Sequence, residues 1–217
     1  SIVEVNCETD FVAKNEDFKT FVNGLAKHIA TIKPKNLDEL NSSICPVCNL
    51  KIEDVVKDKI ATIGEKISIR RFAVLEGNLA TYVHNGKIGV LISASAQDET
   101  LLKDVALHIA SSAPEFVSRN QIPQDIIDEE TRIEMGKEDL QKKPENIRAK
   151  IVEGRVNKLM AQKCLLEQPF VKNPDQTVQD LLNGKLEIKE FVRWTLGEGL
   201  EKRQDNFAEE VMNQMVK

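Results

Sequence analysis

Two short motifs occur twice in the same order, and this internal repeat constrains the fold more than any other feature of the sequence. Lys27-His28-Ile29-Ala30 returns as Leu107-His108-Ile109-Ala110, and the stretch 71–77 resembles the stretch 193–199. His28 and Gly77 are 49 positions apart, whereas His108 and Gly199 are 91 positions apart, an excess of 42 in the second unit. A repeat on this scale predicts two units of one plan, the second with an insertion.

Apolar periodicity indicates the elements of each unit. In the first unit it predicts a strand over 2–6, a helix from the N-cap Asn15 to just before Pro34, a helix over 52–63 ending at Gly64, and a strand over 66–76. In the second unit, Asn85-Gly86 between the runs 79–83 and 87–93 predicts a tight hairpin, because both residues tolerate positive φ. A helix over 99–112, a short helix over 177–182, a strand over 188–196 and a terminal helix over 207–215 follow.

The insertion has the pattern of a helical hairpin. Residues 123–141 and 145–166 are long, charged and helical in period, and Lys142-Lys143-Pro144 interrupts them. A short link containing proline between two helices favours an antiparallel pair. We therefore predict an α+β fold of two related subdomains, each a small antiparallel sheet packed with helices. The expected divisions are 1–86, then 87–122 with 167–199, the inserted hairpin or coiled coil at 123–166, and a helical module at 200–217.

Composition and missing motifs argue against several classes of function. The net charge of −5 is spread along the chain, which disfavours a nucleic-acid binder, although Lys66, Arg70 and Arg71 would be its best material. The chain contains no phosphate-binding loop, no HExxH and no GxSxG, so we expect no enzyme and no cofactor. No apolar run is long enough for a bilayer and no leader is visible, so we expect a cytoplasmic protein without membrane contact. A start at Ser1 indicates a fragment or a processed chain.

The four cysteines include one close pair, Cys45-Pro46-Val47-Cys48. A zinc site needs four ligands, and this pair supplies two; Cys7 and His28 could complete the set in space, but nothing in the spacing points to them. A redox pair of the thioredoxin kind would need a strand before it and a helix after it, which the pattern does not show. The sequence favours reduced thiols over a metal site at Cys45 and Cys48, and the pair is also the best material for an enzyme hypothesis.

The segment 8–15 joins the first strand to the first helix and places a large aromatic residue, Phe11, beside Asp10. Two interpretations are open from the pattern. Phe11 can fold back beneath the helix as a hydrophobic staple, which the pattern alone slightly favours. It can also be an anchor for a partner, since aromatic residues carry much of the binding energy of interfaces.

The residues of this segment match a known family. Val5-Asn6-Cys7-Glu8-Thr9-Asp10-Phe11-Val12-Ala13-Lys14-Asn15 resembles the signature of bacterial elongation factor Ts. The resemblance continues in the family's order through 64–71, 82–91, 107–110, 114–116, 152–155, 168–171 and 197–199. It therefore spans nearly the whole chain.

The resemblance implies a guanine nucleotide exchange factor that binds elongation factor Tu and promotes GDP release. It implies that Thr9, Asp10, Phe11 and Val12 meet the G domain of that partner near its magnesium and phosphate site, and that His108 contacts the partner as well. By pattern alone, both His28 and His108 fall near helix C-termini, where a structural role is the default. The region after Gly199 resembles the family's C-terminal module, which touches the G domain.

The chain departs from the family pattern in two places. Family members usually begin with a small helical domain and a further strand before the signature, and neither precedes it here, so we expect weaker partner binding and a first sheet short of a strand. The segment 42–49, which contains Cys45 and Cys48, has no counterpart in the pattern. Self-association through the hairpin, giving a homodimer, stays open.

Overall fold

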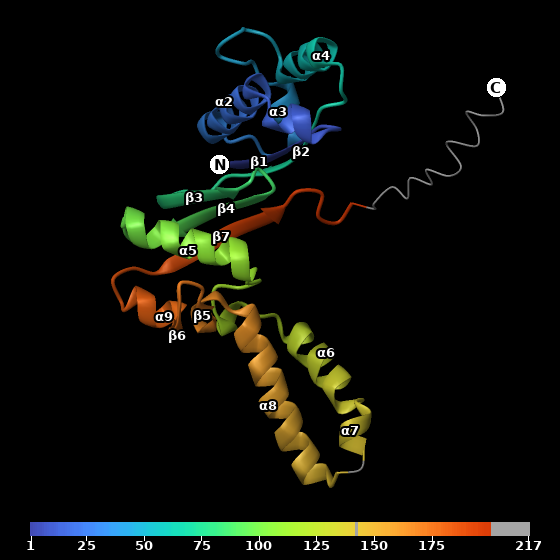
Figure 1. Ribbon diagram of the computed structural model, residues 1–217, viewed down its shortest axis with the longest axis vertical. Coiled ribbons are helices and arrows are strands. Elements are labelled where there is room, and N and C mark those ends of the chain that lie inside the picture. Colours follow the sequence, from blue (N-terminus) through green and yellow to red (C-terminus); the bar gives the residue numbers. More distant parts are fainter. Residues whose placement is uncertain (142, 201–217) are drawn as a thin grey trace, which may run out of the picture.

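The computed structural model describes residues 1–141 and 143–200, and the predicted terminal helix at 207–215 and module at 200–217 lie almost entirely outside these residues. Figure 1 shows an elongated molecule with a projecting helical hairpin. The first unit consists of β1 (Ile2–Asn6), α1 (Asp10–Lys14), α2 (Glu16–Ile32), α3 (Leu37–Ser42), α4 (Ile52–Ile63) and β2 (Ser68–Ala73). Its two strands pair antiparallel, with a bulge after Glu4.

The two long helices of the first unit, α2 and α4, begin and end where the sequence predicted. The Asn15 side chain accepts hydrogen bonds from the amides of Asp17 and Phe18 at the start of α2, and Gly64 ends α4 with a φ of 80°. The apolar faces of these helices meet β1 and β2 around a core built on Leu25, Ile29, Leu40 and Ile52. The short helix α3 was not predicted, because six residues are too few for a period to show.

The second unit is built on a three-stranded antiparallel sheet. It contains β3 (Asn78–His84), β4 (Ile88–Ala94), α5 (Glu99–Ser112), β5 (Pro169–Phe170), β6 (Asn173–Thr177), α9 (Val178–Leu182) and β7 (Ile188–Thr195), with the sheet order β3-β4-β7. Asn85 and Gly86 have φ values of 52° and 69°, which confirms the predicted hairpin turn. The main core of the protein lies between this sheet, α5 and α9, and it includes Ile92, Val105 and Ile109.

The helical hairpin is confirmed, with shorter helices than predicted. It consists of α6 (Gln124–Met135), α7 (Glu138–Gln141) and α8 (Glu145–Lys163), flanked by the single turns η1 (Arg119–Gln121) and η2 (Leu165–Glu167). The helix predicted over 123–141 stops at Gly136, a poor helix former, and restarts as α7. Leu140 and Val152 belong to a separate small core that joins the two arms.

The two units share the local geometry that the repeat predicted. In each, five residues after the repeated histidine, a left-handed residue ends the helix: Lys33 with φ 47° and Ala113 with φ 48°. In each, a strand before the helix pairs antiparallel with a return strand, β1 with β2 and β4 with β7. The structure therefore supports the two-unit interpretation.

The boundary predicted after residue 86 cuts a hairpin. β3 pairs with β4 along the whole of both strands, so β3 belongs to the second sheet, and the sequence failed here because a hairpin signal does not say which sheet the hairpin joins. We propose the boundary at residues 74–77 instead. The two sheets approach closely at Gly89, where an added Cβ would lie 2.9 Å from Cδ1 of Ile2.

Candidate partner-binding site

The predicted connector at residues 8–15 folds into a short helix of its own. α1 begins after Thr9, whose side chain accepts a hydrogen bond from the Val12 amide at 3.3 Å, and it ends at Asn15, the cap of α2. Sequence patterns missed α1 because five residues hold less than two turns of helix. The consequence is that residues 10–14 form a short helix that precedes α2 and projects from it.

Phe11 lies on the outer side of α1. Its side chain is 88% exposed, so the staple interpretation is wrong and the predicted exposure is confirmed. The cause is geometric: the turn of α1 directs Val12 inward, where it is half-buried, and leaves Phe11 in solvent. Burying this side chain would be favourable by roughly 1.5–3 kcal/mol, so its exposure leaves that free energy available for contact with a partner.

Glu65 holds the start of α1 in place from the end of α4. Its Oε2 accepts hydrogen bonds from the amides of Glu8 and Thr9 at 3.1 and 3.0 Å, and its Oε1 accepts one from Thr9 Oγ1 at 2.6 Å. The Thr9 hydroxyl thus donates to Glu65 while it caps α1. Sequence analysis did not find this residue, because it lies 56 positions from Thr9 and no local motif marks it.

Asp10 faces the second subdomain. Its Oδ2 lies 3.4 Å from Nζ of Lys87, the residue just before β4. Both side chains are largely exposed, so this ion pair contributes little to stability. The carboxylate therefore keeps most of its surface for another contact beside Phe11.

A buried ion-pair network joins the two subdomains near α1. The Glu4 carboxylate accepts hydrogen bonds from Arg70 Nη1 at 2.8 Å, from Arg71 Nε at 2.6 Å and from the Gly197 amide at 3.0 Å. Burial opposes its charge, but these donors outweigh burial and hold the pKa of Glu4 below its ordinary value. The Arg71 guanidinium also lies 4.5 Å above the Trp194 ring of β7. Sequence analysis did not find this network, because alternation places Glu4 on the face of β1 opposite Val3 and Val5, and its arginine partners lie 66 and 67 positions away.

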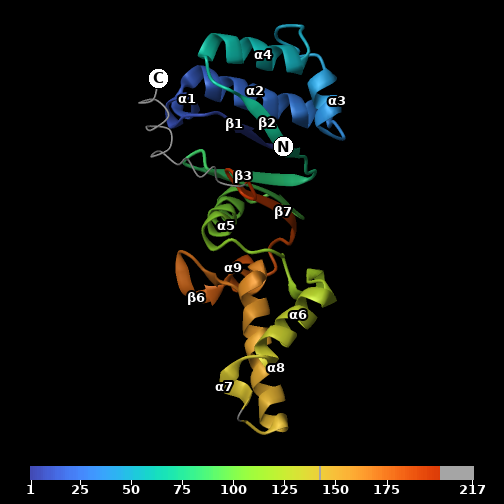
Figure 2. The same ribbon diagram turned by 90° about the vertical axis from the view of Figure 1, so that its right-hand side faces the viewer.

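His108 lies far from this surface in the fold. α5 covers one face of the β3-β4-β7 sheet and β1 packs near the other face, so the sheet separates His108 from Phe11 (Figure 2). The His108 side chain is 0% exposed. Its Nε2 lies 2.8 Å from Oε1 of Gln168, and its Nδ1 accepts a hydrogen bond from the Val171 amide at 3.2 Å. Burial lowers its pKa despite the opposing bond to Gln168, which agrees with a neutral ring.

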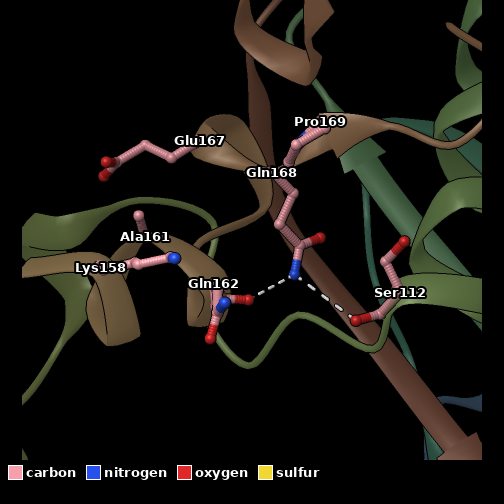
Figure 3. Close-up of a pocket in the computed structure, with 7 residues that line it drawn as sticks. All are labelled: Ser112, Lys158, Ala161, Gln162, Glu167, Gln168 and Pro169. Atoms are coloured by element: carbon pink, nitrogen blue, oxygen red, sulfur yellow. Dashed lines mark hydrogen bonds between the residues drawn. The ribbon is translucent and has the colours of Figure 1, made fainter. Parts of the chain in front are cut away.

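Gln168 forms the floor of a shallow depression beside His108 (Figure 3). Its Nε2 donates to the carbonyl oxygens of Gln162 at 2.6 Å and Ser112 at 3.5 Å. The lining residues are Ser112, Lys158, Ala161, Gln162, Glu167, Gln168 and Pro169. Because the Gln168 amide is engaged with the protein itself, this side chain links α5, η2 and α8 rather than being free to bind a ligand.

Cys45 and Cys48 lie in the turn between α3 and α4. Within residues 1–141 and 143–200, no three His, Cys, Asp or Glu side chains are grouped so as to hold a metal ion. Cys7 and His28, the two residues that could have completed a ligand set, have other partners: Cys7 Sγ donates to the Thr9 carbonyl at 3.4 Å, and His28 Nε2 lies 2.8 Å from Ser43 Oγ. No helix of the described part is long and apolar enough to span a membrane.

Comparison with known sequences places this geometry in a family. The sequence model described as Elongation factor TS matches residues 8–198. Elongation factor Ts of Alkalilimnicola ehrlichii is 43% identical over 217 residues, which cover 98% of this chain and 74% of that protein.

The chain belongs to the elongation factor Ts family. Elongation factors Ts act in protein biosynthesis, in guanine nucleotide exchange during translation elongation. The match begins at Glu8, so Thr9–Val12 and His108 both lie inside the part of the chain that the Ts family shares.

Proposed function

We propose that this chain binds elongation factor Tu and promotes release of its GDP, with no bond-making chemistry of its own. The observation that carries the proposal is Phe11, an aromatic side chain that is 88% exposed on a clamped five-residue helix. The membership of the Ts family supplies the partner. The proposal also places the protein in the cytoplasm, where translation takes place.

The mechanism follows from linkage between two ligands of one partner. If the chain binds empty elongation factor Tu more tightly than the loaded form, GDP weakens the chain by the same factor by which the chain weakens GDP. Burial of Phe11 in the G domain would provide roughly 1.5–3 kcal/mol, or about one to two powers of ten. Burial of one side chain is too small to explain fast exchange by itself. Insertion near the magnesium and phosphate site must act through lost phosphate contacts as well.

Asp10 supplies a candidate for that second effect. Its exposed carboxylate lies beside Phe11 and has only the weak pairing with Lys87. In a site that binds phosphates, a carboxylate repels the nucleotide and competes for its hydrogen-bond donors. Thr9 and Val12 take part by fixing the helix from its cap and its inner side.

We propose that His108 acts on the partner surface indirectly. Direct contact would require the ring to leave the core and to lose both of its hydrogen bonds. Its Nδ1 holds the Val171 amide in the turn between β5 and β6, and the Val171 side chain is exposed. His108 would thus position this turn for the partner.

Stopped-flow release of a fluorescent GDP analogue from elongation factor Tu tests the proposal. Substoichiometric amounts of the chain are expected to accelerate release in a saturable way, because an exchange factor turns over. Release that is no faster with the chain than without it would refute the function.

A further inference from the structure

The turn between α3 and α4 carries a pair of thiols that exchange activity does not use. The isolated β-bridge between Ile44 and Lys51 closes this turn, and the Cys45 amide donates to the Leu50 carbonyl at 2.8 Å. The Asn49 amide donates to the Cys45 carbonyl at 3.0 Å, and Asn49 has a φ of 56°. The backbone thus reverses directly after Cys48, so the two cysteines lie on one small loop.

The two thiols lie three positions apart on this closed turn. Cys45 is half-buried and packs against the core of the first unit, and cysteine sulfur is a ligand that zinc prefers. The neighbouring side chain of Cys48 is exposed. The backbone closure of the turn therefore holds two soft ligands on one short loop.

Within residues 1–141 and 143–200, no third His, Cys, Asp or Glu side chain joins the two thiols, so this part of one copy leaves the site incomplete. Zinc bound by thiolates is almost always tetrahedral with four ligands. Two copies related by a twofold axis would supply Cys45 and Cys48 twice, with the ion on the axis.

The surface around the thiols suits a second copy of the same loop. Residues 40–50 contain no charged side chain, although 30% of the chain is charged, so two loops meet without repulsion. Val47 is 92% exposed, and Ile44 and Leu50 are also exposed, which places an apolar rim around the sulfur atoms. Apolar exposure next to unsatisfied ligands is the pattern of an interface rather than of a free surface.

We propose that the Cys45–Cys48 loop is half of a zinc site that joins two copies of this chain. Formation of the site releases the protons of four thiols as four thiolates bind one zinc ion. The loop lies beyond the C-terminal half of α2, because Ser43 contacts His28, whereas α1 precedes the first residue of α2. Thirteen helical residues separate these ends, about 20 Å, so a zinc-linked dimer leaves Phe11 accessible. The inference is independent of the proposed exchange activity.

Zinc uptake and molar mass, measured together on the full chain, test the inference. Chelator-treated protein kept reduced is titrated with zinc, bound metal is measured by mass spectrometry, and molar mass is followed by light scattering. The expected result is about one zinc ion per two chains, a doubling of the molar mass, and reversal of both by chelator. Cobalt in place of zinc should give the absorption of a tetrahedral four-thiolate site.

Two variants and one control make the test specific. Cys48→Ser, at an exposed position that leaves folding unaffected, should abolish both the zinc uptake and the dimer, as should Cys45→Ser. Cys7→Ser should change neither the zinc uptake nor the dimer. Cys7 precedes α1, far from this loop in the chain, and its thiol has its own partner at Thr9. Uptake of one zinc ion per chain without a dimer, a dimer that forms without zinc, or no uptake would each overturn the inference.

Discussion

Replacing Glu65 by alanine should weaken exchange without unfolding the protein. The variant removes the acceptor for the Glu8 and Thr9 amides and for the Thr9 hydroxyl, three hydrogen bonds of 3.1, 3.0 and 2.6 Å. A hydrogen bond contributes about 0.5–1.5 kcal/mol net, and since these groups are exposed and water can replace the carboxylate, the low end applies, about 1.5 kcal/mol in all. That lowers the ratio of ordered to disordered α1 about tenfold, and exchange efficiency falls by up to the same factor if ordered α1 is the competent form.

The assay is GDP release from elongation factor Tu at several concentrations of the variant, with amide hydrogen exchange at Thr9 and Val12 as the structural readout. Glu65→Gln should fall in between, since its one carbonyl oxygen still accepts from the amides. Glu76→Ala is the matched control, because Glu76 is an exposed carboxylate paired with Lys33 at the far end of α2. Unchanged release together with faster amide exchange would show that ordering α1 does not matter for activity, and would refute the reasoning.

Three further predictions concern stability. Glu4→Ala should lower the free energy of unfolding, measured in urea, by about 3 kcal/mol, because it leaves two arginines without their buried partner. Since the pKa of Glu4 is lowered in the fold, its contribution to stability is present above the ordinary pKa of about 4.3 and is lost as pH falls below that value. Glu4→Gln should flatten this dependence of stability on pH. His108 has a lowered pKa, so stability should decline as pH falls below about 6.5, and His108→Gln should remove this decline in pH-dependent urea titrations. Leu140→Ala should cost about 2–5 kcal/mol and raise amide exchange in the hairpin more than in α5.

Much of the fold was predictable because its signals are local. Asn15, Gly64 and Asn85-Gly86 mark helix ends and a turn by their own backbone preferences, and the structure confirms each. The long helices α2 and α5 were found because an amphipathic period shows clearly over about four turns or more. The hairpin was predicted from charge and a proline, although Gly136 divides its first arm.

The remaining features depend on contacts between distant residues. The assignment of β3 to the second sheet follows from its pairing with β4 and from the packing of the two sheets at Gly89, neither of which a local pattern encodes. Glu65 and Glu4 act on partners more than 50 positions away. The exposure of Phe11 was expected from the family resemblance, whereas its pattern alone favoured a buried staple.

The burial of His108 shows the opposite case. Its pattern alone predicted a structural histidine near a helix end, and the structure agrees, with both ring nitrogens engaged inside the protein. The resemblance predicted a direct contact with the partner. A positioning role through Val171 reconciles the two.

GDP release with Phe11→Ala tests the central claim most directly. Val47→Ala is the matched control, since Val47 is 92% exposed and Phe11 is 88% exposed. Phe11 lies before the start of α2, whereas Val47 lies in the turn beyond the other end of that helix. With zinc excluded, the account predicts that Phe11→Ala slows release by about one to two powers of ten with an unchanged melting temperature, while Val47→Ala releases GDP like the parent chain. Release by Phe11→Ala at the parent rate would contradict the claim that this side chain displaces the nucleotide.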